Sequence, residues 1–78
     1  MKIGTVTGVV WSSRKAPSLM GQTFLVVQTM EGQVVAADQV GAGTGDKVLL
    51  VTGTAASRFC MEAPVDAAVV AILDPKER

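Results

Sequence analysis

Five short runs of β-branched and other apolar residues constrain the fold of this chain more than any other feature. They span residues 2–11, 22–30, 33–38, 47–52 and 67–73. Glycine, proline and polar residues separate the runs, and runs of this length and composition are typical of strands. The fourth run is nearly all apolar, as expected for a strand covered on both faces. The sequence therefore predicts a chain built mainly from five strands.

The segments between these runs predict the connections. Glu31-Gly32 predicts a tight hairpin, in which glycine supplies the positive φ that primed turns need. Residues 14–21 contain proline and glycine and predict a loop. Residues 54–58 follow a glycine and predict a short helix with Thr54 as its N-cap.

Alternation along the first run predicts how its side chains face. One face would carry Val6, Gly8 and Val10, and the other Thr7, Val9 and Trp11.

These elements predict an all-β fold with one short helix, arranged as a small five-stranded OB-like β-barrel. Closure into a barrel removes the exposed strand edges that promote aggregation. An open sandwich is the alternative. Residues 1–74 would form this single domain, and residues 75–78 a short polar tail.

The hydrophobic content is high for so short a chain. Of the 78 residues 49% are hydrophobic, and the mean hydropathy is +0.41. A domain of this length buries only about 60% of the surface that its unfolded chain exposes. A monomer would leave much apolar surface in water, so we expect self-association.

Charge and aromatic content argue against a nucleic-acid partner. Seven basic residues balance seven acidic ones, and Arg14-Lys15 is the longest basic cluster. The three aromatic residues, Trp11, Phe24 and Phe59, are few for stacking several bases. No apolar run approaches the ~20 residues that span a bilayer, and the first residues lack a secretory signal. We therefore expect a cytosolic protein that binds neither nucleic acid nor membrane.

The residues that usually carry catalysis are scarce. Histidine is absent, and the lone Cys60 has no imidazole to activate it, so we interpret it as a structural thiol. The carboxylates stand singly near the predicted strand ends, where Asp commonly caps or turns the chain. We predict no catalytic residues, no metal site, no cofactor and no enzymatic activity.

The glycine loop, Gly41-Ala42-Gly43-Thr44-Gly45-Asp46, matches neither of two common phosphate-binding loops. Walker A needs a Lys and a Ser or Thr after its last glycine, and the dinucleotide fingerprint must open a helix. Asp46 would also repel a phosphate. The run is interpreted as a tight connection between strands, or as a place of close backbone approach around a symmetry axis.

The large side chains have two interpretations each. Trp11 and Phe24 are predicted to be anchors of the core or of a subunit interface. Arg14 and Arg58 are either solvated or charges at that interface.

Several segments together resemble the bacterial microcompartment vertex family, often called the EutN/CcmL family. The combination of the glycine loop, the Leu-Leu-Val strand and the Pro-Val-Asp strand is specific, and the order holds from Met1 to Asp74. The matching segments are Ala16-Pro17-Ser18-Leu19, Phe24-Leu25-Val26-Val27-Gln28, Val35-Ala36-Ala37-Asp38, residues 40–46, residues 48–53 and residues 64–74.

The resemblance implies an OB-like barrel that assembles as a homopentamer and fills the corners of a polyhedral shell tiled by hexameric proteins. It also implies that Gly41, Ala42, Gly43, Thr44 and Gly45 lie nearest the five-fold axis. In the family, a Gly-Ser-Ser/Ala-Ala run is followed directly by an Arg. The matching run here is residues 53–56, but Ser57 stands at the position of that Arg, and Arg58 comes one residue later. Family members often have a longer hairpin than Glu31-Gly32. We still expect a pentamer, because the barrel segments are intact.

Two other classes of function stay open from the residues alone. One is an OB-type binding module for single-stranded nucleic acid or a small ligand. The other is a small enzyme with carboxylates shared between subunits. The neutral charge weighs against the first, and the absence of histidine against the second.

Overall fold

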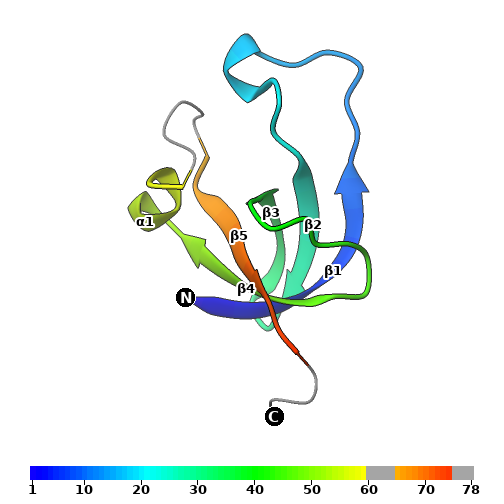
Figure 1. The fold of residues 1–78 in the computed structure, drawn as a ribbon, viewed down its shortest axis with the longest axis vertical. Helices are drawn as coiled ribbons and strands as arrows, with labels where there is room; N and C mark the ends of the chain where they lie inside the picture. The colour runs from blue at the N-terminus through cyan, green and yellow to red at the C-terminus, as the bar shows by residue number, and fades with distance from the viewer. Residues whose placement is uncertain (60–64, 75–78) are drawn as a thin grey trace.

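A computed structural model of the chain describes residues 1–59 and 65–74. Within these residues the predicted strands and short helix are all present (Figure 1). In chain order the elements are β1 (Lys2–Val10), the 3-10 turn η1 (Pro17–Leu19), β2 (Phe24–Thr29), β3 (Gly32–Asp38), β4 (Lys47–Thr52), α1 (Thr54–Ser57) and β5 (Ala67–Ile72).

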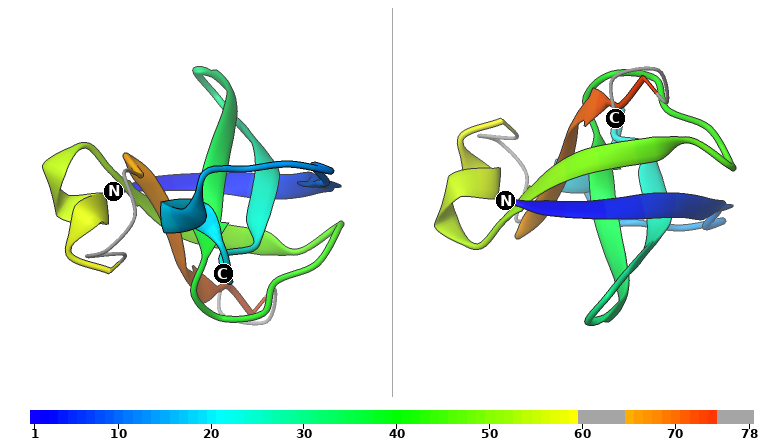
Figure 2. Two further views of the ribbon diagram at one scale, coloured as in Figure 1. Left: turned by 90° about the horizontal axis from the view of Figure 1, so that it is seen from above. Right: turned by 90° about the horizontal axis from the view of Figure 1, so that it is seen from below.

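The strands close into a barrel in the order β1-β2-β3-β5-β4, and β4 pairs back onto β1. Neighbouring strands are antiparallel except β3 and β5, which run parallel over the short register Ala37↔Ala68 and Asp38↔Val69. The views along the vertical axis show the strands curving around a common interior (Figure 2). The predicted closed OB-like barrel is therefore confirmed, and the open sandwich is wrong.

Aliphatic side chains fill the barrel. The largest fully buried ones are Leu25, Leu50, Val6, Val27, Val48 and Val69. Most are β-branched, and such side chains pack well on a pleated surface while losing little rotamer freedom there. Each contributes about 1.5–3 kcal/mol through burial, so the barrel interior is the main source of stability.

A β-bulge in β1 changes the predicted facing of its side chains. Val6 pairs with Val27, but Gly8 pairs with Val26, so β1 holds one extra residue at this point. Beyond the bulge Val9 packs against the core, and Val10 is exposed. The predicted face of Val6, Gly8 and Val10 is therefore wrong, because an inserted residue inverts the alternation of all residues after it.

The β2–β3 hairpin exists, but its turn lies one residue earlier than predicted. Thr29 pairs with Gly32, so Met30 and Glu31 form the turn, and neither has a positive φ. It is therefore not the predicted primed turn. Gly32 does have φ +123°, but it is the first residue of β3.

The side chain of Thr29 explains the shape of this turn. Its Oγ1 accepts a hydrogen bond from the backbone N–H of Glu31 at 3.1 Å. It also donates to the carbonyl oxygen of Gly32 at 2.9 Å. The Thr29 hydroxyl thus links the residues of the turn by two hydrogen bonds, so the turn forms without the backbone angles of a primed turn.

The short helix begins at Thr54 but is not capped by it. Gly53 occupies the N-cap position with φ +70°, and no side-chain hydrogen bond caps the helix. The predicted Thr54 cap is therefore wrong, because Gly53 takes the N-cap position and Thr54 is the first residue of the helix. Ala56 of α1 packs on Val51 and Ala68, which covers the outer face of β4 at this end.

Two predictions fall outside the described residues, namely Cys60 and the tail 75–78. Within residues 1–59 and 65–74, no helix has the length and apolar character that crossing a membrane demands.

Candidate functional site

The glycine loop connects β3 to β4 and lies against β1. Gly45 donates its backbone N–H to the carbonyl oxygen of Val6 at 2.8 Å, and Val6 donates to the carbonyl of Asp46 at 2.9 Å. Figures 1 and 2 place this loop on the same side of the barrel as the C-terminal end of β1, opposite α1. The predicted tight connection between strands is therefore confirmed.

The carboxylates of Asp38 and Asp46 accept hydrogen bonds from backbone N–H groups of the glycine loop. Oδ1 of Asp38 accepts hydrogen bonds from the N–H groups of Val40 at 3.1 Å, Gly41 at 3.0 Å and Ala42 at 3.2 Å. Oδ2 of Asp46 accepts from the N–H of Gly43 at 2.8 Å. Hydrogen bonds to an ionised group are the stronger kind, so these carboxylates fix the conformation of the loop.

The loop-holding role of these two aspartates was not predicted. Single Asp residues near strand ends were expected only to cap or turn the chain. The available signal was the position of Asp38 three residues before the glycine-rich run, where a carboxylate can reach the N–H groups two to four residues ahead.

The glycines of the loop have different reasons to be glycine. Gly41 and Gly45 have φ of +78° and +94°, where other residues are strained. Gly43 has no such φ, and a Cβ there would meet nothing within 4 Å. Nothing in the described part of the subunit therefore requires glycine at position 43.

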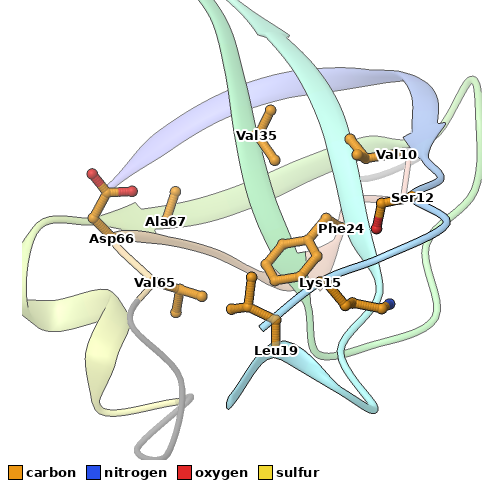
Figure 3. A pocket seen from close by; sticks show the side chains of 9 residues that line it. All are labelled: Val10, Ser12, Lys15, Leu19, Phe24, Val35, Val65, Asp66 and Ala67. Carbon is orange, nitrogen blue, oxygen red and sulfur yellow. The ribbon is translucent and has the colours of Figure 1, made fainter. Parts of the chain in front are cut away.

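A second feature is an open apolar cleft of about 340 Å³ near η1 (Figure 3). Leu19, Phe24 and Val65 pack around Ala37 on one side of it. Figure 3 shows Lys15 and Asp66 at separate places on its margin. The full lining is Val10, Ser12, Lys15, Leu19, Phe24, Val35, Val65, Asp66 and Ala67.

The predicted interface residues belong to different segments of the chain. Phe24 lines the cleft and is half-buried, whereas Trp11, directly after β1, is 87% exposed. The core interpretation of Trp11 is therefore wrong. Arg14 is exposed in the loop after β1, and Arg58 is exposed after α1. Trp11 lies next to Phe24 in the sheet, because Val10 pairs with Phe24, whereas Arg58 follows α1.

Other large apolar side chains also lie exposed on the subunit. Ile3 is 57% exposed, Val35 53% and Phe59 51%. Single exposed apolar residues are common, but here Val10 and Val35 line one cleft and therefore form a connected apolar surface. Within residues 1–59 and 65–74, no three His, Cys, Asp or Glu side chains are placed to hold a metal ion.

These features define a small closed OB-like barrel whose glycine loop is held by its own carboxylates and whose apolar cleft is open to solvent. The sequence matches the family described as "Ethanolamine utilisation protein EutN/carboxysome" over residues 1–74. The chain therefore belongs to the EutN/CcmL family.

Relatives of similar sequence are named as shell vertex proteins. The chain is 51% identical to the carboxysome shell vertex protein CcmL of Synechococcus elongatus, with 95% of this chain and 84% of the relative aligned. It is 40% identical to the bacterial microcompartment shell vertex protein PduN of Salmonella typhimurium, with 95% and 96% aligned.

Solved structures share the fold. CcmL of Gloeobacter violaceus superposes with a TM-score of 0.87 at 42% identity, covering 95% of this chain and 86% of that one. The pentameric microcompartment shell protein GrpN of Rhodospirillum rubrum gives a TM-score of 0.85 at 37% identity, covering 95% and 94%.

Proposed function

We propose that this protein is a structural subunit of a bacterial microcompartment shell, where its homopentamers cap the five-fold vertices. The observation that carries the proposal is the match over residues 1–74 to a family whose relatives are named shell vertex proteins. These comparisons favour a shell protein over the OB-type binding module. A flat hexagonal sheet closes into a polyhedron only where five-fold units are inserted.

The surrounding assignments follow from this role. The neighbours of the pentamer would be hexameric shell proteins, and the protein would work in the bacterial cytoplasm as part of the compartment shell. Its role would be mechanical, without catalysis, cofactor, nucleic acid or membrane. Residues 1–74 would act as one domain.

The subunit contact in such a ring joins two different surfaces, because head-to-tail rings are heterologous. The candidate surfaces satisfy this requirement. Trp11 and Arg14 follow β1, whose last residue Val10 lines the cleft together with Phe24, whereas Arg58 and Phe59 follow α1 (Figure 1). We assign the first group to one face of the contact and the second group to the other.

The glycine loop, residues 41–45, is assigned to the opening on the five-fold axis. Gly43 supports this assignment, since no constraint within the described chain explains a glycine there. Close approach of five copies of the loop would explain it.

Replacement of Gly43 by Trp tests this position. Gly43→Trp should narrow or disorder the central opening in electron micrographs of the rings. Met30→Trp, a change at the exposed hairpin turn, is the control. Intact rings with an unaltered opening in Gly43→Trp would place the loop elsewhere.

Co-assembly tests the proposed function as a whole. Hexameric shell proteins from a microcompartment should form open sheets or tubes alone, and closed polyhedra when this protein is added. Electron microscopy distinguishes these forms. Sheets that stay open at all mixing ratios would refute the vertex role.

A further inference from the structure

The glycine loop resembles an anion-binding loop in composition, and its backbone N–H groups decide whether it is one. Glycine-rich turns bind phosphate when successive N–H groups point at the ligand. Here most of these N–H groups already donate within the chain. Those that do so belong to Val40, Gly41, Ala42, Gly43, Gly45 and Asp46.

Carboxylates accept most of these hydrogen bonds. Asp38 takes the place that a phosphate oxygen would occupy over Val40, Gly41 and Ala42, and Asp46 does the same at Gly43. An external oxyanion would have to displace a covalently tethered carboxylate at each point, and the tether gives the internal group a high effective concentration.

The charge balance of the segment adds to this effect. Residues 38–47 contain Asp38, Asp46 and the single cation Lys47, so each subunit contributes net negative charge near the loop. A ring brings several copies of this charge together, and rings of carboxylates disfavour anions in narrow openings.

We propose that the loop forms an anion-excluding rim around the opening. The carboxylates of Asp38 and Asp46 occupy the N–H groups that an oxyanion would bind, and their negative charge makes the opening favour cationic and neutral solutes over inorganic oxyanions. Asp38 is the positioning residue of this rim. The placement of the rim on an axial opening rests on the proposed function, whereas the occupied N–H groups and the charge belong to each subunit alone.

Two kinds of solution NMR measurement on the ¹⁵N-labelled full chain test the proposal. Inorganic phosphate at millimolar concentration should leave the amide signals of Gly41 and Gly43 in place. The cationic nitroxide 4-amino-TEMPO should relax loop amides about twofold more than the anionic 4-carboxy-TEMPO at low salt, because the local potential concentrates the cation.

Two variants of Asp38 separate the effect of its hydrogen bonds on the loop conformation from the effect of its negative charge. Asp38→Asn keeps an oxygen acceptor, so the loop amide shifts should persist while the ratio between the two nitroxides falls toward one. Asp38→Ala frees three N–H donors, and its affinity for phosphate should rise about tenfold or more. Asp66→Asn removes the same charge at the cleft and should leave the loop ratio unchanged.

Phosphate shifts at Gly41 and Gly43 in the unmodified protein would overturn the proposal, as would an equal or stronger effect of the anionic nitroxide. An unchanged nitroxide ratio in Asp38→Asn would also overturn it. Native mass spectrometry of the same samples distinguishes failure of the vertex role from failure of the anion-excluding rim. A monomer would refute the vertex role alone, and a pentamer that prefers the anionic probe would refute the rim alone.

Discussion

At the scale of single residues, the two glycines of β1, Gly4 and Gly8, differ in the space available for a side chain. A Cβ on Gly4 would stand 2.5 Å from Cγ1 of Val27 and 2.8 Å from the carbonyl oxygen of Gln28. A Cβ on Gly8 would meet nothing within 4 Å. Neither residue has a positive φ, so only the steric environment separates them.

Alanine substitutions at these two positions test the packing of β1 on β2. Gly4→Ala should destabilise the fold by about 2 kcal/mol, since backbone and a buried side chain must both shift. Gly8→Ala should change stability by no more than about 0.5 kcal/mol. Urea unfolding at equal protomer concentration measures both, and equal midpoints for the two variants would contradict the close contact at Gly4.

A surface ion pair joins the hairpin turn to the start of β1. The ammonium of Lys2 bonds the carboxylate of Glu31, and this hydrogen bond and charge hold the pKa of Glu31 below its ordinary value. A lowered folded-state pKa stabilises the protein above the unfolded-state pKa, and this stabilisation is lost as pH falls through the folded value. The pair is exposed, so the effect is small and screened by salt.

Titration of the Glu31 carboxyl by NMR checks this pair. Its pKa should lie below the ordinary Glu value at low salt and return toward it in Lys2→Met or at high salt. Lys15→Met should leave it unchanged. A low pKa that survives the loss of Lys2 would assign the shift to another cause.

The candidate site was only partly predictable at this scale. The glycine loop was recognisable from composition, and the absence of phosphate binding there stays a prediction. The occupants of its N–H groups are local, since Asp38 and Asp46 bond N–H groups only two to four residues away, but composition alone does not indicate which donors each carboxylate takes.

At the scale of elements, the β2–β3 hairpin depends on one buried hydroxyl. Thr29 is 7% exposed, and its Oγ1 bonds both Glu31 and Gly32. The Glu31-Gly32 sequence predicts a turn on the glycine, because primed turns prefer it. The observed turn is instead defined by a side chain of the preceding strand, for which the sequence has no comparable signal.

Thr29→Val removes this hydroxyl at nearly constant shape. It should destabilise the fold by about 1–3 kcal/mol, because the N–H of Glu31 and the carbonyl of Gly32 lose their partner. Thr7→Val removes only a 3.3 Å bond on the exposed face and is the matched control. Similar losses in thermal unfolding for the two variants would show that the hairpin does not depend on Thr29.

The positions of the strands were predictable, because β-branched runs between breakers are a strong signal. The bulge in β1 was not, since the local residues alternate equally well in either register. It occurs where Val6 exchanges hydrogen bonds with Gly45 and Asp46, a contact between segments far apart in the sequence.

At the scale of the whole molecule, the barrel is complete while part of its apolar surface stays exposed. Trp11 and Phe59 contribute large apolar areas without supporting the barrel interior. Buried aromatic residues dominate the energy of interfaces, so such side chains are the natural anchors of a subunit contact.

Alanine substitutions should separate assembly from folding. Trp11→Ala should weaken ring association by about 2 kcal/mol or more, because a central aromatic anchor is lost. The circular dichroism spectrum should not change, since Trp11 lies outside the core. Met30→Ala, also fully exposed, should leave association intact. Undiminished rings in Trp11→Ala, measured by sedimentation velocity, would remove this residue from the contact.

The vertex role requires that this barrel assemble into rings of five. Native mass spectrometry of the purified protein across micromolar concentrations measures the number of subunits in each species. We predict a dominant species of five subunits that persists on dilution. A protein that stays monomeric throughout that range, or that forms only dimers, would contradict the vertex role and leave the exposed apolar surface without an explanation.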